Sequence, residues 1–342
     1  MTPPLAQPDS DPPGRAPVRR WTRSHYADID EQAAALQGWN QDYLQLSAGA
    51  FSGAVQRLEL DGVGLFVEDL RQAVHQTGHV RPDVVALGVP VVLLGDAHFC
   101  GQACDADAMH VFSGHDGFEF RSPQRHVMLG IEVDLPLFES HVVDPATGGA
   151  TAFASRARLL DGDSTALPAL RQFLLTLFAS VVHEPDWLDV DQRRLQARDE
   201  LLDHLAAAIV PLGGQAQCAP PRAAMPAAHT ALAERARQLV AGRLDDPPTV
   251  GDLCAQLGVS RRTLQSCFQS TWAMGPLCWL KTMRLNAVRR RLKTARSVTE
   301  AATQFAFWHF GHFATEYRAM FGETPSQTLR RQGRVSAARH AP

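Results

Sequence analysis

The sequence of 342 residues lacks an apolar run long enough to cross a membrane, because a spanning helix needs about 20 such residues. The longest apolar run, Val84–Leu94, is interrupted by Gly88 and Pro90. Residues 1–20 lack the apolar stretch of a secretory signal peptide. The six cysteines are irregularly spaced and do not suggest a disulfide framework. These absences argue against an integral membrane or secreted protein and favour the cytoplasm.

The common signatures of catalysis are also missing. The sequence contains no glycine-rich phosphate loop, no Gly-x-Ser-x-Gly motif and no paired-carboxylate arrangement. Four possible zinc ligands lie close together, as His98, Cys100, Cys104 and His110, but their spacing matches no common zinc finger. His110, His115 and Glu119 lack the adjacent histidine pair of a cupin-type metal site. We therefore expect no catalytic residue and no metal site, and keep a cupin-like metal-dependent enzyme or metal sensor as the alternative.

Charge is unevenly distributed along the chain. The whole sequence has a formal net charge of −3. Residues 229–342 carry a net charge of +10, whereas residues 1–228 carry −13. A basic module attracts phosphates and an acidic one repels them, although a merely solvated basic surface is the alternative. Charge and length together predict two domains with different partners.

The spacing of apolar residues changes several times along the N-terminal region. Residues 1–20 contain six prolines and are expected to be a disordered tail. Residues 28–46 show helix-like apolar spacing, interrupted by Gly38. Short β-like segments follow over residues 51–135, with turn residues about every ten positions. They predict an antiparallel β-barrel or sandwich, for which we choose a cupin-like barrel.

Helical spacing returns after the predicted barrel. Residues 167–210 predict two helices that pack on the barrel or pair with a second subunit. We therefore assign residues 21–210 to an N-terminal sensor and dimerisation domain of α+β class with flanking helices. Residues 211–228, rich in proline, glycine and small residues, are expected to be a linker. Trp39, His126 and Met128 are candidates to line an effector pocket, with ordinary core or surface packing as the alternative.

The basic module begins with the spacing of a helix-turn-helix unit over residues 249–269. A short helix at 250–257 is followed by Gly258, which suits a left-handed turn, and by Ser260, which can cap the next helix. Residues early in that second helix are expected to enter the major groove and read bases. The base-reading candidates are Arg261, Arg262, Gln265 and Ser266, with Ser260 as a phosphate contact.

A long helix over residues 276–293 is predicted to lead to a second unit over residues 298–321. Ser297 and Glu300 have the spacing of a capping box at the start of that unit. His312 and Thr315 are its base-reading candidates, a poorer set that favours recognition of shape, methyl groups or phosphate. The expected phosphate contacts are Arg289, Arg290, Lys293 and His309. Residues 333–342 form a basic tail.

This module resembles the DNA-binding domain of AraC/XylS transcriptional regulators. The resemblance covers residues 230–332 and rests on the motifs LCAQLGVS (253–260), LQSCF (264–268), WLKTMRLNA (279–287), AFWHFGHF (306–313) and FGETPS (321–326). It implies an all-α domain over 229–332 with two helix-turn-helix units on one long helix, in a regulator expected to be an activator. The sequence departs from the family pattern at two places. Ala306 stands where a glycine is common, and Gly275 directly precedes Pro276, where many members have a further residue.

The resemblance is closest to the branch that contains the ethanolamine-utilisation operon regulator. It rests on residues 284–290 (RLNAVRR) and 307–315 (FWHFGHFAT), and on the opening between residues 28 and 51. It implies ethanolamine as a possible effector, with adenosylcobalamin as co-effector. The partners expected for such a protein are double-stranded DNA, a small-molecule effector, RNA polymerase and a second copy of the chain.

Overall fold

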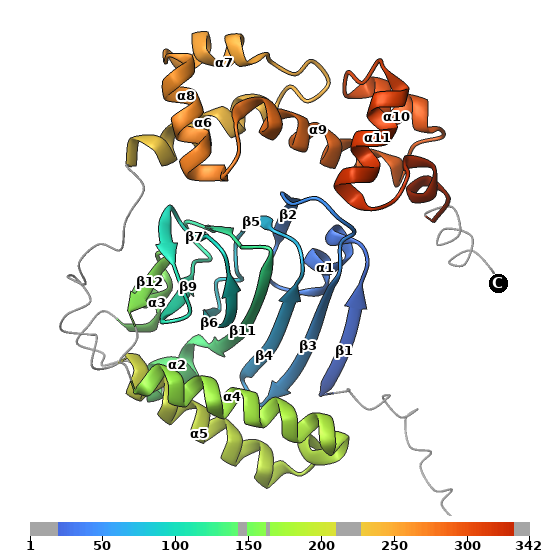
Figure 1. Cartoon of the computed structure of the whole chain (residues 1–342). Helices are drawn as coiled ribbons and strands as arrows, with labels where there is room; N and C mark the ends of the chain where they lie inside the picture. Colours follow the sequence, from blue (N-terminus) through green and yellow to red (C-terminus); the bar gives the residue numbers. More distant parts are fainter. Residues whose placement is uncertain (1–19, 143–148, 162–164, 210–226, 332–342) are drawn as a thin grey trace, which may run out of the picture.

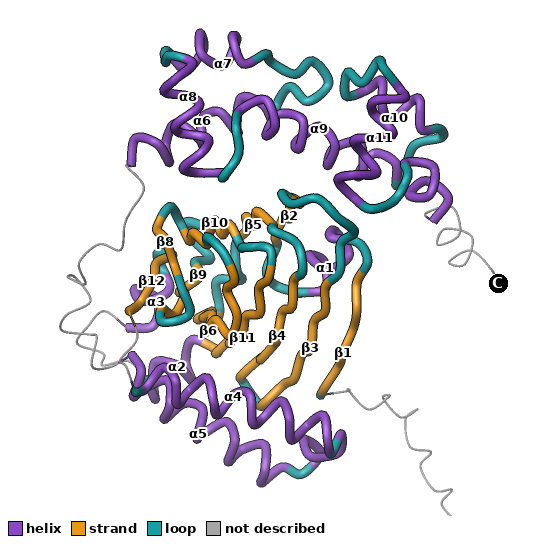
Figure 2. Tube along the Cα trace, viewed as in Figure 1, coloured by secondary structure: helices purple, strands orange, loops and turns teal. Residues whose placement is uncertain are grey.

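The computed structural model describes residues 20–142, 149–161, 165–209 and 227–331 (Figure 1). The predicted tail over 1–20, the linker over 211–228 and the basic tail over 333–342 lie almost entirely outside the described residues. The N-terminal part is built on β-sheets, and the C-terminal part is entirely helical within its described residues (Figure 2). The helical part lies over one end of the sheets (Figure 1).

The strands of the N-terminal part form two antiparallel sheets. The larger sheet has the order β1 (Trp21–Tyr26), β3 (Gly53–Leu60), β4 (Val63–Leu70), β11 (Arg125–Asp134), β6 (Val84–Leu94), β9 (Ala108–Phe112), β12 (Arg158–Asp161). The smaller sheet has the order β2 (Gln41–Gln45), β5 (Val74–Gly78), β10 (Phe118–Arg121), β7 (Ala97–Phe99), β8 (Gln102–Cys104). Among the described strands, neither sheet closes on itself. The α+β class therefore stands, but the expected closed barrel is wrong, and strands extend beyond the expected range 51–135.

The helix-like stretch 28–46 divides into a helix and a strand. Helix α1 (Ile29–Ala35) begins at Asp28, whose carboxylate accepts hydrogen bonds from the backbone N–H groups of Asp30 and Glu31. Gly38 follows with φ of 87°, a left-handed conformation that glycine adopts without steric cost. The chain then enters β2. The expectation of helical spacing over residues 28–46 was therefore wrong for the residues after Gly38.

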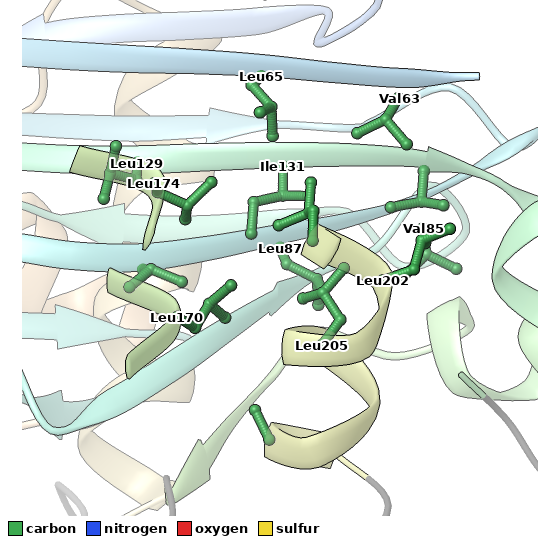
Figure 3. Packing of buried hydrophobic residues seen from close by; sticks show 14 of the residues in the cluster. Val63, Leu65, Val85, Leu87, Leu129, Ile131, Leu170, Leu174, Leu202 and Leu205 are labelled. Carbon is green, nitrogen blue, oxygen red and sulfur yellow. The ribbon is translucent and has the colours of Figure 1, made fainter. Parts of the chain in front are cut away.

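The outer face of the larger sheet is covered by two helices. Helices α4 (Ala166–His183) and α5 (Asp191–Ile209), joined by the 3-10 helix η2 (Pro185–Asp189), lie where helices were expected. Side chains alternate along each strand, so Leu65 and Ile131 pack against Leu170 and Leu205 (Figure 3). Among the described helices, α4 alone has the length and apolar composition to cross a membrane, and a third of that window is buried.

The inner face of the larger sheet packs against the smaller sheet through aromatic residues. The Phe112 ring of β9 makes edge-on contacts with Phe99 and Phe118 of the smaller sheet, at centroid distances of 5.2 and 4.8 Å. Trp39, just before β2, packs edge-on against Phe66 and Phe112 at 5.2 and 4.7 Å. Gly130 lies under Phe66, and a Cβ atom there would come within 2.0 Å of that ring. Two short helices, α2 (Leu135–His141) and α3 (Gly149–Ala154), complete the N-terminal part.

Within its described residues, the C-terminal part contains a helical stretch over residues 325–331 and, before it, six labelled helices. The six are α6 (Ala227–Ala241), α7 (Val250–Leu257), α8 (Arg261–Trp272), α9 (Pro276–Leu292), α10 (Val298–Gln304) and α11 (Phe310–Phe321). Helix α9 takes part in two separate hydrophobic cores. Trp279 and Leu280 belong to the core with α6, α7 and α8, whereas Val288 and Leu292 belong to the core with α10 and α11. The part is therefore two small helical units on one shared helix.

Candidate DNA-binding surface

The first unit, α7 and α8, has the turn geometry that its sequence predicts. Gly258 has φ of 70° and ends α7 in the left-handed region. The Ser260 hydroxyl accepts a hydrogen bond from the backbone N–H of Thr263 at 3.1 Å and so caps α8. A reciprocal capping box, not foreseen from the sequence, joins Thr249 and Asp252 at the start of α7. These local signals hold α8 at a defined angle to α7.

The N-terminal end of α8 presents the predicted base-reading side chains to solvent. Exposed residues at this end are Arg261, Arg262, Gln265 and Ser266. The arginines follow the capping serine directly, whereas the Gln265 amide lies beside Gly275, where a Cβ atom would come within 3.0 Å of Nε2. Arginine and glutamine can each make two hydrogen bonds to a base edge. The structure thus brings the four predicted residues of the first unit together on one exposed helix end.

The second unit, α10 and α11, differs from its prediction in two details. Ser297 caps α10 by accepting from the Glu300 N–H at 3.1 Å, but the Glu300 carboxylate accepts from the backbone of Arg296 rather than from Ser297. The predicted reciprocal box is therefore only half formed. The turn before α11 places Ala306 at φ of 59°, a left-handed conformation that is costly for a residue with a Cβ atom.

The N-terminal end of α11 is exposed and largely apolar. His309 and His312 face solvent, and the Thr315 hydroxyl bonds back to the Gly311 carbonyl at 3.1 Å. Sequence reasoning did not single out Trp308, which is 68 % exposed, beside Phe310 at 44 %. An exposed Trp next to a recognition helix could have been suspected from the sequence because it breaks the apolar period of the core. This end therefore suits contacts with thymine methyl groups and sugars more than hydrogen bonding.

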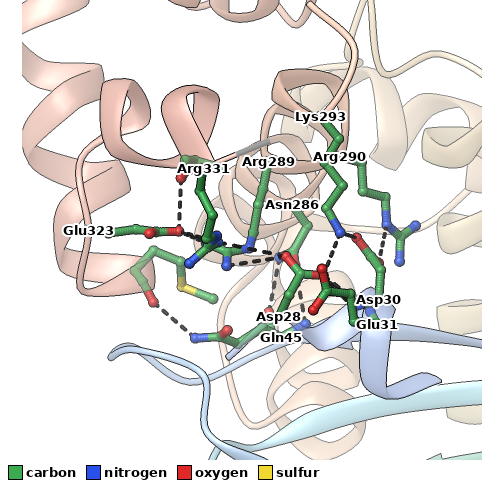
Figure 4. Close-up of polar contacts among 12 residues, drawn as sticks. Asp28, Asp30, Glu31, Gln45, Asn286, Arg289, Arg290, Lys293, Glu323 and Arg331 are labelled. Carbon is green, nitrogen blue, oxygen red and sulfur yellow. Dashed lines mark hydrogen bonds and ion pairs between the residues drawn. The ribbon is translucent and has the colours of Figure 1, made fainter. Parts of the chain in front are cut away.

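Three of the predicted phosphate contacts lie against the N-terminal domain instead of solvent (Figure 4). Arg290 pairs with Asp30 at 3.0 Å and with Asp42 at 2.6 Å, and donates to the Tyr43 carbonyl at 2.6 Å. Lys293 contacts the carboxylates of Asp28 and Asp30. In this arrangement these cations are already neutralised.

Arg289 is the most deeply buried of the three cations. Its guanidinium lies 2.7 Å from Glu323, 3.5 Å from Asp28 and 4.8 Å from the centroid of the Phe321 ring. Burial by itself raises the pKa of Asp28, but Lys293 and Arg289 outweigh it and lower the pKa below its usual value. Asp28 is therefore ionised at neutral pH and forms a charged contact between the domains.

Uncharged contacts extend this interface along the helical part. The Asn286 side chain exchanges two hydrogen bonds with the Gln45 backbone, at 3.2 and 3.0 Å. The Met320 carbonyl accepts from Gly49 N–H and from Gln45 Nε2, both at 3.0 Å. Sequence reasoning missed these residues. The only signal was the opposite net charge of the two halves, which indicates that they can attract each other but not where.

The candidate effector-pocket residues lie together between the two sheets. Trp39, His126 and Met128 line one small cavity with Glu68, whose free space of about 10 Å³ has room for a single water molecule. Burial and the nearby Arg125 lower the pKa of His126 to about 3, so its ring is neutral. All three side chains pack in this hydrophobic core. With a cavity of this size, the alternative interpretation, ordinary core packing, describes them.

The possible zinc ligands are not arranged around a common centre. The His98 ring accepts a hydrogen bond from Arg121 at 2.5 Å, and the His110 ring stacks on Phe99 at a centroid distance of 4.5 Å. Among the described residues, no group of three or more His, Cys, Asp or Glu is placed to hold a metal ion.

Comparison with known proteins matches the helical part. Residues 253–331 match the family model described as a helix-turn-helix domain. The XylDLEGF operon transcriptional activator 3 of Pseudomonas putida is 35% identical over 103 residues, which is 29% of this chain and 31% of that protein. The probable thc operon regulatory protein of Rhodococcus erythropolis is 40% identical over 88 residues, 25% of this chain and 26% of that protein. The chain thus spans less than a third of each of these curated relatives.

The alignment with a solved structure covers more of the chain, but its sequence identity and structural similarity are low. The crystal structure of the AraC-like transcriptional activator CuxR aligns with 78% of this chain and 94% of that chain, at 14% identity and a TM-score of 0.42. A score at this level carries no argument about the N-terminal fold. The sequence match, by contrast, identifies residues 253–331 as a helix-turn-helix domain.

Proposed function

We propose that this chain is a DNA-binding transcriptional regulator of the AraC/XylS family, acting as an activator. The observation that carries the proposal is the pair of helix-turn-helix units on α9, each with an exposed N-terminal helix end. Such ends enter successive major-groove segments about 34 Å apart, one turn of the duplex. Arg261, Arg262, Gln265 and Ser266 read bases in one segment, and His312 and Thr315 contact the other. Ser260 and His309 contact phosphate.

The phosphate role first expected for Arg289, Arg290 and Lys293 requires separation from the N-terminal domain. Since these cations pair with carboxylates in the docked structure, we propose that they contact DNA only if the domains part. The two relatives described above are named as operon regulators, one of them as a transcriptional activator, which supports regulation of transcription and a contact with RNA polymerase. A regulator of chromosomal genes acts in the cytoplasm, and we do not favour the metal-dependent enzyme or metal sensor.

Selection of duplexes from a random pool by the full chain tests DNA binding. We expect an enriched site with two conserved segments one helical turn apart, and an affinity that falls steeply as salt rises. Arg262→Ala, in the first unit, is the matched variant. We expect it to lose sequence preference in the segment that the first unit contacts, while the other segment is still enriched. A chain that enriches no sequence at any salt concentration would contradict the proposal.

We propose that the N-terminal domain binds a small organic cation as effector. An open groove of about 650 Å³ lies between α1 and the start of β2, and its lining includes Asp30, Asp42 and Arg81. Its two carboxylates also pair with Arg290, so a bound cation would compete with α9 for them. This volume is typical of small-ligand sites. The resemblance to the ethanolamine branch makes ethanolamine, with and without adenosylcobalamin, the first candidate. A thermal-shift assay should show a higher melting temperature with ethanolamine and no change with uncharged ethylene glycol. Equal shifts with both would contradict a site for a cation.

We also propose a homodimer that forms through α4 and α5. Apart from His183 at its C-terminal end, the exposed residues of α4 are uncharged: they are Pro168, Ala169, Gln172, Leu175, Thr176, Ala179 and Val182. Leu175 and Val182 are 37 % and 40 % exposed, as is expected for an apolar stripe that another surface covers. Sedimentation of the wild type should give a dimer, and Leu175→Glu should give a monomer. A wild type that stays monomeric at high concentration would contradict this proposal.

A further inference from the structure

We infer that the carboxylates of Asp28, Asp30 and Asp42, here called the acidic edge, position the two recognition helices relative to each other. The inference rests on the proposed function, because it assigns these N-terminal residues a role in DNA recognition. They would act through α9 and would not touch DNA. They are therefore positioning residues.

The two helix-turn-helix units need such a device because their cores are separate. The first core takes Trp279 and Leu280 from α9, and the second takes Leu285 and Val288 further along the same helix. An ion pair between Lys281 and Glu316, at 2.9 Å, connects the first half of α9 to α11, but both side chains are more than a third exposed. Exposed pairs contribute little to rigidity. The angle between the units therefore depends on α9 and on whatever holds it.

The N-terminal domain contacts both units and the helix between them. The His75 ring meets the Trp272 ring at the end of α8, with a centroid distance of 4.6 Å. Asn286 in the middle of α9 bonds to the Gln45 backbone, and the Gln45 side chain reaches Met320 at the end of α11. The acidic edge adds the charged contacts of Arg290 and Lys293 at the end of α9 (Figure 4). Contacts spread over three helices restrain both units against one rigid surface.

Docking leaves the reading ends uncovered. Helices α8 and α11 have 12 residues each, which corresponds to a length of about 18 Å. Trp272 and Met320, which contact the N-terminal domain, lie at the C-terminal ends of these helices. Arg262 and His312 lie near the opposite ends and are exposed. The docked structure is therefore compatible with DNA contact, and the acidic edge is placed to support it rather than to compete with it.

The sharpest test changes only the N-terminal domain. In the full chain, Asp30→Asn combined with Asp42→Asn removes the carboxylates that pair with Arg290, while every side chain of the helical part stays unchanged. Asp83→Asn is the matched control, because Asp83 is exposed and pairs with Arg81 rather than with α9. In assays without effector, any loss of DNA affinity in the double variant then arises through docking.

The readout compares a selected duplex that contains both segments with two duplexes that contain one segment each. Joining two binding modules raises affinity through effective concentration, which falls when their geometry loosens. We expect the double variant to lose about tenfold in affinity for the two-segment duplex and less than about twofold for either single segment. A merely structural role would lower all three affinities together.

A charge swap keeps the test independent of folding. Asp42→Arg in an Asp30→Asn background should reduce the two-segment preference, and adding Arg290→Asp to these changes should restore much of it. Unchanged preference in all variants, or tighter binding by the double variant as expected for an autoinhibitory contact, would overturn the inference alone. Failure of the wild-type chain to bind any duplex would overturn the proposed function, and this inference with it.

Discussion

The two helix-turn-helix units share one backbone plan but differ in what stabilises them and in the side chains at their exposed helix ends. The first unit has an apolar core around Phe268 and Trp279 and a polar, basic reading end. The second unit adds the buried charge of Arg289 and has a reading end of histidine and exposed aromatic residues. The same motif can therefore combine different sources of stability with different side-chain chemistry at its exposed helix end.

The largest expected effect is on the stability of the second unit. Arg289→Ala removes a buried cation from Asp28 and Glu323, but Asp28 keeps Lys293 and Glu323 keeps Arg331. The lost charge-assisted hydrogen bonds are therefore expected to cost about 1.5–3 kcal/mol. Calorimetry should show a large drop in the melting temperature of the helical part. Arg291→Ala is the control, because its pair with Glu300 is about a third exposed and is expected to contribute less than about 1 kcal/mol. Equal losses of stability in the two variants would show that the buried Arg289 contributes no more than the partly exposed Arg291.

The next expected effect separates the reading chemistry of the units. Gln265→Ala should relax sequence preference at one base pair of the first segment by about 1–3 kcal/mol. Thr315→Ala in the second unit should change preference less, because its hydroxyl already bonds to the Gly311 carbonyl. Affinities for a panel of single-base variants of the selected duplex measure both. Equal loss by Gln265→Ala on specific and random duplexes would show that Gln265 does not read bases.

A smaller effect is expected at the two turns. Gly258 and Ala306 both have left-handed φ angles, of 70° and 59°, but only the first is a glycine. Ala306→Gly should therefore stabilise the protein by about 0.5–1 kcal/mol, and Gly258→Ala should destabilise it by about 1–2 kcal/mol. Denaturant unfolding measures both. Destabilisation by Ala306→Gly would mean that the alanine methyl group makes packing contacts worth more than the relieved strain.

The turns also show why the helices of the C-terminal part could be predicted from the sequence. Gly258, Ser260 and the apolar spacing of α7 and α8 are local signals, so the predicted helix over 250–257 matches α7 as observed. The sheet domain depends on pairing between distant strands, such as β1 with β3 and β11 with β4. Alternation predicts strands but not which of them pair, so a closed barrel was expected where two open sheets exist.

The candidate site was predictable only in part for the same reason. The exposure of Arg261 and Arg262 follows from their place directly after a helix cap. The burial of Arg289 and the pairing of Arg290 with Asp30 depend on how two domains dock, which involves residues about 260 positions apart. Arginines on a basic helix give the same local pattern whether they face phosphate or a neighbouring domain.

The smallest expected effect concerns the aromatic end of the second unit. Trp308 is 68 % exposed, so Trp308→Ala should leave the melting temperature unchanged. If its ring covers a thymine methyl group, the contact contributes about 0.8 kcal/mol, the value for one buried methylene-sized group. Replacing thymine with uracil in the selected duplex removes that methyl group. The two changes should then be non-additive, because each removes the same contact, whereas fully additive losses would place Trp308 away from the thymine methyl groups of the second segment.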